Sequence, residues 1–143
     1  MRWLKNIAAW AFATLTTVVA ASAVHSIDVQ SRLLGLGVRI PWPLRLSTGL
    51  DDFIGLAPAL LAVLGGALAL GFIIAAILRP RLPALAPIAF PLAGAAAVAT
   101  ALALMARQMA MTPIASARDW PGFTMLCVAG AIGGLVFSRL RPR

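Results

Sequence analysis

Hydrophobic residues dominate four long stretches of this chain, and charged residues lie only near the ends of those stretches. A helix needs roughly 20 mostly apolar residues to cross a hydrocarbon core about 30 Å thick. We therefore expect spanning helices at about residues 7–25, 50–78, 83–110 and 119–139. Backbone polar groups cannot stay unpaired in lipid, so short connections between such helices favour a compact arrangement. The predicted fold is an all-α integral membrane protein, a single four-transmembrane-helix bundle over residues 1–143.

Basic residues predict the orientation, because cytoplasmic loops carry an excess of lysine and arginine. With four spans, one side carries basic residues and no acidic side chain: Arg2, Lys5, Arg79, Arg81, Arg139, Arg141 and Arg143. The other side, called the outer side here, carries the remaining arginines and all the aspartates. We therefore expect both termini in the cytoplasm.

Composition agrees with a membrane protein and narrows its partners. Hydrophobic residues make up 62% of the chain, charged residues 11%, and the mean hydropathy is +0.96. Soluble domains are nearer half apolar and a quarter charged. Arginine greatly outnumbers lysine and alanine is abundant, which is typical of GC-rich bacteria, so we expect a bacterial inner membrane. The net charge of +8 favours contact with membrane lipids. No basic patch alternates with stacking aromatic residues, so we expect no nucleic-acid partner.

The first span has a second interpretation as a cleaved signal peptide. Two basic residues precede an apolar stretch, and the triplet Ala21-Ser22-Ala23 fits a cleavage site. Cleavage would leave three spans with unchanged orientation. Alanine-rich helices also produce such triplets by chance, which favours an uncleaved helix.

The longest connection, 26–49, is predicted to be an outer interfacial segment between the first and second helices. Ser26 can begin a short helix that Gly35 ends. From 38 to 46, apolar residues alternate with arginine or proline, which favours an extended ribbon with one apolar face. We expect this ribbon at the membrane–water boundary, held by the lipid-anchoring residues Arg39, Trp42 and Arg45. An ordinary loop is the alternative.

Capping patterns predict where two of the helices begin. Thr48 and Asp51 resemble a capping box at the start of the second helix. Ser116 and Asp119 form the same pattern before the fourth helix.

Prolines and glycines predict bends and close contacts. We expect Pro58 to bend the second helix, and Pro87 with Pro91 to leave the cytoplasmic half of the third kinked or loosely bonded. Gly130 and Gly134 form a GxxxG motif, which lets helix backbones approach closely. We expect these glycines to pack the fourth helix against the protein's own helices, with self-association as the alternative.

Polar residues gather at the outer helix ends and form a candidate site. This outer polar cluster comprises His25, Asp28, Arg32, Asp51, Asp52, Arg107, Arg118 and Asp119. His25 lies three residues before Asp28, a spacing that suits a proton-handling or phosphate-binding pair on a helix. The alternative is structural, because aspartates stabilise helix N-termini and arginines anchor helices at a membrane surface.

Met105 and Met109 share a helix face one turn apart, and their thioether groups suit Cu(I). A MxxxM motif at the outer end of a span, followed by a GxxxG span, resembles the eukaryotic high-affinity copper transporter family. That resemblance implies an oligomeric copper pore. The chain departs from the family in its short turn between the second and third spans. Methionine also fills packing gaps, so this metal site is an alternative interpretation.

The predicted spans lack the residues that several classes of membrane protein require, and this narrows the possible functions. Ion pumps and proton-coupled carriers place ionisable residues within the bilayer, and the span interiors contain none. The chain also lacks nucleotide-binding and zinc-binding motifs, so we expect no cofactor. We expect a non-catalytic accessory or assembly subunit that binds membrane lipids, a membrane-protein partner or further copies of itself through its outer polar face. The alternatives are an oligomeric transporter or pore, and an enzyme acting on lipid headgroups.

Overall fold

The computed structural model describes residues 1–108 and 115–141 of the chain. Its elements are α1 (Arg2–Gly35), α2 (Trp42–Leu78), the short 3-10 helix η1 (Pro83–Leu85), α3 (Ala89–Gln108), a second 3-10 helix η2 (Ala115–Arg118) and α4 (Trp120–Leu140). The four α-helices are long and apolar enough to cross a membrane. The prediction of four apolar helices is therefore confirmed.

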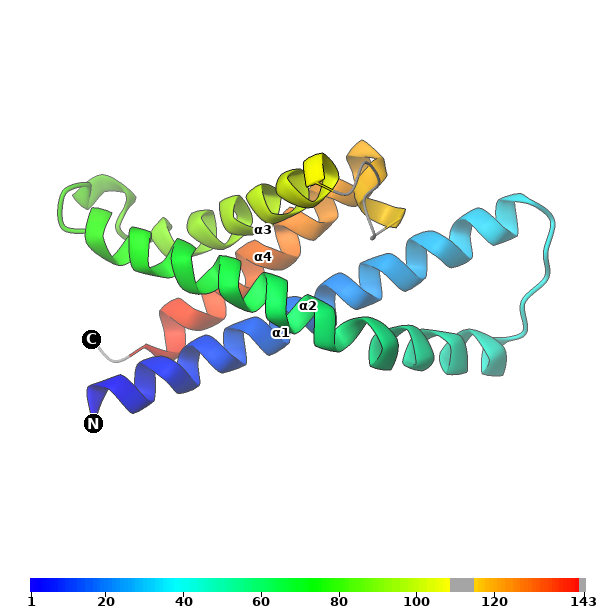
Figure 1. The fold of residues 1–143 in the computed structure, drawn as a ribbon, viewed down its shortest axis with the longest axis horizontal. Helices are drawn as coiled ribbons and strands as arrows, with labels where there is room; N and C mark the ends of the chain where they lie inside the picture. Colours follow the sequence, from blue (N-terminus) through cyan, green and yellow to red (C-terminus); the bar gives the residue numbers. More distant parts are fainter. Residues whose placement is uncertain (109–114, 142–143) are drawn as a thin grey trace.

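The four helices form a closed antiparallel bundle in which each packs along its neighbours in sequence. α4 returns to pack along both α3 and α1, while α2 and α4 scarcely touch. Both chain ends lie at the same end of the bundle (Figure 1). We call this the terminal end.

The helices differ greatly in length. At about 1.5 Å per residue, α3 and α4 are each about 30 Å long, close to the hydrocarbon thickness of a bilayer. α1 and α2, with 34 and 37 residues, are about 50 and 55 Å long. Their excess length projects beyond α3 and α4 and is joined by residues 36–41 (Figure 1). We call residues 29–50 the projecting hairpin.

This hairpin corrects the prediction of an extended ribbon. α1 continues without a break from the bundle to Gly35, and α2 is already helical from Trp42. Pro41 precedes α2 and Pro43 lies in its first turn, where proline is tolerated because the N–H groups there have no helical acceptor. The strict alternation from 38 to 46 was therefore accidental. Gly37 lies in the tight turn between α1 and α2. Its φ of 82° is in the left-handed region, which favours glycine.

The two predicted capping boxes are not formed. Thr48 lies inside α2, and its hydroxyl donates a hydrogen bond to the carbonyl of Leu44 at 2.8 Å. Asp119 is the residue before α4, but its side chain makes no capping hydrogen bond. Its carboxylate has a partner on α1 instead, as described below.

The disturbance predicted at the start of the third helix takes the form of a late start, because residues 83–88 form η1 and a turn instead of helix. α3 starts at Ala89, after Pro87, and Pro91 falls in its first turn. A proline there removes no backbone hydrogen bond. Pro58 does lie inside α2.

Small side chains bring the helices of the bundle together. A Cβ atom on Gly134 would collide with the backbone of Phe90, and one on Gly94 with the carbonyl of Gly130, so α3 and α4 touch backbone to backbone. Gly133 makes an equally close approach to Thr17 of α1. Without a hydrophobic driving force in lipid, such close contact is the main source of attraction between helices.

Candidate functional site

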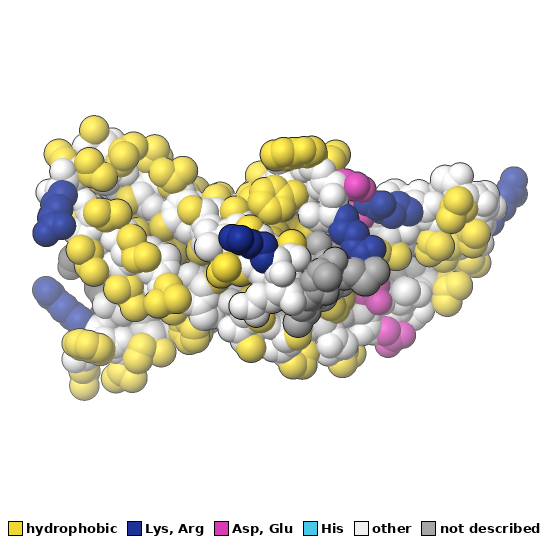
Figure 2. Space-filling view, turned by 45° about the horizontal axis from the view of Figure 1, so that its top comes forward, with side chains coloured by type: hydrophobic (Ala, Val, Ile, Leu, Met, Phe, Trp, Pro, Cys, Tyr) yellow, Lys and Arg dark blue, Asp and Glu magenta, His cyan; other side chains and the backbone are white. Residues whose placement is uncertain are grey.

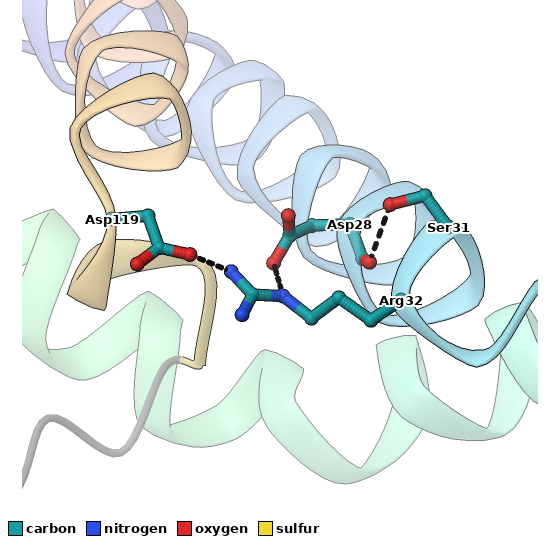
Figure 3. Close-up of polar contacts among 4 residues, drawn as sticks. All are labelled: Asp28, Ser31, Arg32 and Asp119. Atoms are coloured by element: carbon teal, nitrogen blue, oxygen red, sulfur yellow. Dashed lines mark hydrogen bonds and ion pairs between the residues drawn. The ribbon is translucent and has the colours of Figure 1, made fainter. Parts of the chain in front are cut away.

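Three residues of the outer polar cluster meet where the projecting hairpin leaves the bundle (Figure 3). Arg32 of α1 donates from Nε to the carboxylate of Asp28 at 2.9 Å and from Nη2 to the carboxylate of Asp119. The side chain of Arg32 therefore ties α1 to the start of α4. The hydrogen bonds that Arg32 donates to Asp28 and then to Asp119, together with the negative charges of both carboxylates, raise the pKa of the Arg32 guanidinium above its ordinary value.

The predicted pair of His25 and Asp28 does not form. Asp28 is engaged by Arg32, and Nδ1 of His25 is buried without a hydrogen-bond partner among the described residues. Asp51, Asp52 and Arg107 do not join the ion-pair network. The structure thus brings together two residues of α1 and the residue before α4.

Ser116 lies in η2, although the sequence pattern predicted it as part of a capping box before the fourth helix. It is fully buried, and its hydroxyl has no partner in the described part of the chain. Its backbone carbonyl lies where a Cβ on Gly122 of α4 would be placed. Gly122 therefore allows η2 to pack directly on the first turn of α4.

Arg45 has a role in the hairpin turn that the sequence did not indicate. Its Nε donates to the carbonyl of Ile40 at 3.1 Å, and its guanidinium lies 5.4 Å from the centre of the Trp42 ring. The side-chain amide of Gln30 on α1 donates to the carbonyl of Arg45 at 3.1 Å. These contacts hold the two arms of the hairpin together near its tip.

The surface of the projecting hairpin is unusually apolar. Large hydrophobic side chains are exposed on both arms and on the connection: Leu33, Leu34, Leu36, Val38, Trp42, Leu44, Leu46 and Leu50. Leu36 is 80% exposed and Trp42 is 73% exposed. Between the arms lies a hollow of about 320 Å³. Figure 2 shows acidic and basic side chains gathered between the broad bundle and the narrow hairpin, with hydrophobic side chains on both sides of them.

A groove of about 800 Å³ runs between α2 and α3. Its lining is apolar except at its ends, where Arg79 and Gln108 lie, and at Thr100. Beside Arg79, three aromatic rings pack together at the terminal end, from Phe72, Phe90 and Phe137.

The alternative copper site cannot be assembled from the described residues. Met105 lines the α2–α3 groove, whereas Met109 lies outside the described residues. Over residues 1–108 and 115–141, no group of three or more histidine, cysteine or acidic residues could hold a metal ion.

Comparisons with protein-family models, with curated proteins and with solved structures give no match. The function is therefore inferred from the geometry of this chain.

Proposed function

We propose that this protein is a multi-pass subunit of a bacterial inner-membrane complex, with both termini in the cytoplasm and no catalytic role. Its bundle spans the membrane, and its projecting hairpin binds a protein partner on the outer side. The observation that carries this proposal is the exposed apolar surface of the hairpin beyond the charged residues that mark the end of the bundle.

The position of the charges supports an aqueous environment for the hairpin. Asp28, Arg32 and Asp119 lie at the level where α4 begins, one hydrocarbon thickness from the terminal end. Charged residues avoid the bilayer centre, so these three fit the outer membrane surface. The helical arms of the hairpin, residues 29–35 and 42–50, then extend about 10 to 14 Å into the region outside it.

Exposed leucine and tryptophan are costly in water. Covering a large apolar side chain contributes about 1.5–3 kcal/mol, and contiguous exposed apolar patches commonly mark interaction sites. The hairpin presents such side chains on both arms. A protein partner with a matching apolar surface would cover them, whereas the lipid-facing residues of the bundle need no such cover.

The arrangement of the polar groups favours binding over catalysis. Both carboxylates of the ion-pair network are engaged by the single guanidinium of Arg32, and that network joins α1 to α4. A nucleophile beside a base and an orienting group would be needed for hydrolysis. The nearby Ser116 hydroxyl is buried and has no hydrogen-bond partner among the described residues.

Site-specific photo-cross-linking in native membranes tests this proposal. A photoreactive amino acid at Leu36 or Trp42 should give a discrete protein cross-link, and one at Ile73, equally apolar and 57% exposed on the bundle, should not. Leu44→Asp should abolish the hairpin cross-link while leaving the amount of protein in the membrane unchanged. Cross-links to lipid alone would show that the hairpin lies on the bilayer. A product of twice the chain mass would identify self-association instead.

A further inference from the structure

Two arginines from different helices converge on one aromatic ring at the terminal end. The guanidinium carbon of Arg79, just after α2, lies 5.9 Å from the centre of the Phe90 ring. That of Arg141, just after α4, lies 5.1 Å from the same centre. Each arginine gains from the negative face of the ring and from the helix C-terminus that it follows. Their like charges repel each other, because both guanidinium groups lie beside the same ring.

No acidic side chain is placed to neutralise this pair. The four aspartates are the only acidic residues in the sequence, and those that form ion pairs do so at the opposite end of the bundle. One terminal nitrogen of Arg141, Nη1, is buried and has no hydrogen-bond partner among the described residues. A buried charged donor is strongly destabilising unless an acceptor reaches it. The site therefore calls for an anion.

The α2–α3 groove begins beside the same arginine. Arg79 is the only charged residue that lines it, and leucine, isoleucine, alanine and glycine line most of the rest. Gly71 lies eight residues before Arg79, about 12 Å along the helix. There α2 and α3 are in close contact, because a Cβ on Gly71 would lie 3.0 Å from that of Ala97. This depth is close to that of one leaflet, about half of the 30 Å hydrocarbon core.

We propose that this end of the molecule binds one anionic phospholipid. The phosphate lies between the guanidinium groups of Arg79 and Arg141, and the acyl chains occupy the part of the groove between Arg79 and Gly71. Basic pockets between spanning helices commonly bind anionic headgroups in this way. The inference rests on the membrane embedding in the proposed function, but it involves the end opposite to the hairpin.

The groove fits a lipid better than a partner helix. Its single charge lies at one mouth, and the part next to that charge offers no other polar side chain. A ligand with one anionic end and an apolar body matches this distribution.

The test compares lipid binding to delipidated full-length protein in detergent, measured by native mass spectrometry with phosphatidylglycerol and phosphatidylcholine. The wild type should prefer phosphatidylglycerol by about 30-fold, as the attraction of two arginines for a lipid of net negative charge implies. The phosphate of phosphatidylcholine is neutralised by its own choline group. Arg79→Gln with Arg141→Gln should reduce the preference to about twofold or less. Arg81→Gln with Arg139→Gln is the matched control, because it removes the same charge from exposed residues that do not lie on the Phe90 ring, and it should keep the preference.

A second pair of variants tests the groove without changing charge. Ala96→Phe fills the groove from an exposed position on its wall and should lower phosphatidylglycerol binding at least several-fold. Ala76→Phe, exposed on α2 outside the groove, should not. Equal loss in the control variants, or no preference in the wild type, would overturn the proposal. Since this assay uses purified protein and leaves the hairpin intact, its failure is distinguishable from a failure of the hairpin cross-link.

Discussion

α1 and α2 run through both the bundle and the projecting hairpin, and they bury apolar side chains in the first region and expose large ones in the second. Within the bundle, α1 and α2 bury alanine, leucine and threonine against α3 and α4. Beyond it, the same helices expose leucine and tryptophan, and within the described residues they pack mainly on each other. Small residues therefore stabilise the bundle where helix backbones meet. The large apolar residues of the hairpin stay exposed, because no neighbouring helix covers them.

Glycine makes the contrast plain. In the bundle, Gly94, Gly130 and Gly134 lie where a Cβ atom would collide with a facing backbone. In the hairpin, the nearest atom to a Cβ on Gly49 would be the hydroxyl of Ser26 at 3.9 Å, and Gly35 has nothing within 4 Å. Glycine is thus indispensable at the helix contacts of the bundle and replaceable at Gly35 and Gly49 of the hairpin.

The largest expected effect concerns which sides of the membrane the two regions face. In a Cys127→Ala background, an impermeant thiol reagent added outside the cell should label Leu36→Cys fully and Leu82→Cys not at all. The hairpin tip and the turn between α2 and η1 lie at opposite ends of the molecule (Figure 1). Labelling of Leu82→Cys from outside would reverse the proposed orientation.

Replacing the packed glycines of the bundle should destabilise the protein far more than replacing a glycine of the hairpin. Gly130→Leu and Gly134→Leu should each cost about 3 kcal/mol or more, because a leucine forces α3 and α4 apart. Gly49→Leu should change stability by about 0.5 kcal/mol or less. Gly66→Leu is a control on the bundle itself, since a Cβ there meets nothing within 4 Å. Thermal unfolding in detergent provides the measurement. If Gly134→Leu unfolded at the same temperature as Gly66→Leu, the close contact of α3 and α4 would be wrong.

The ion pair between the two regions should have a smaller effect. Arg32→Gln and Asp119→Asn should each lower the unfolding temperature slightly, because exposed ion pairs contribute little. In a double-mutant cycle the two losses should not add, since each variant removes the same contact. Asp51→Asn, outside the network, should combine additively with Arg32→Gln. Full additivity of Arg32→Gln and Asp119→Asn would mean that the two side chains act independently.

The smallest effect should be confined to the hairpin tip. Arg45→Gln removes the hydrogen bond to Ile40 and the contact with Trp42, so amide hydrogen exchange over residues 36–41 should become faster. Arg39→Gln should leave that exchange unchanged. Exchange rates in the bundle serve as the internal reference.

The sequence predicted the bundle better than the hairpin for a physical reason. Length and hydrophobicity alone specify a spanning helix, and the fourth helix was placed within about a residue of Trp120–Leu140. In the hairpin, a period-two pattern competed with a helical one. Residues 42, 46, 49, 50 and 53, which line the hollow between the arms, recur at helical spacing. Two prolines suggested a ribbon, although proline also suits the start of a helix.

The candidate site was predictable in composition but not in pairing. The sequence placed Asp28, Arg32 and Asp119 at one end, because topology brings those helix ends together. It could not show that Arg32 would bridge the aspartates, since that depends on how α4 is set against α1. The convergence of Arg79 and Arg141 on Phe90 was missed for the same reason, because it joins residues from three helices.

The unbroken course of α1 from the bundle into the hairpin has a mechanical consequence. A continuous helix behaves as a stiff rod, so a force applied by a partner at the hairpin tip would tilt the whole of α1 as a lever. α2 contains Pro58, which removes one backbone hydrogen bond near the base of the hairpin and makes that point easier to bend. α1 is thus a rigid lever, whereas α2 bends more easily at Pro58, below the hairpin. In the proposed function, a pull on the tip would tilt α1 and carry the motion to the opposite end of the molecule.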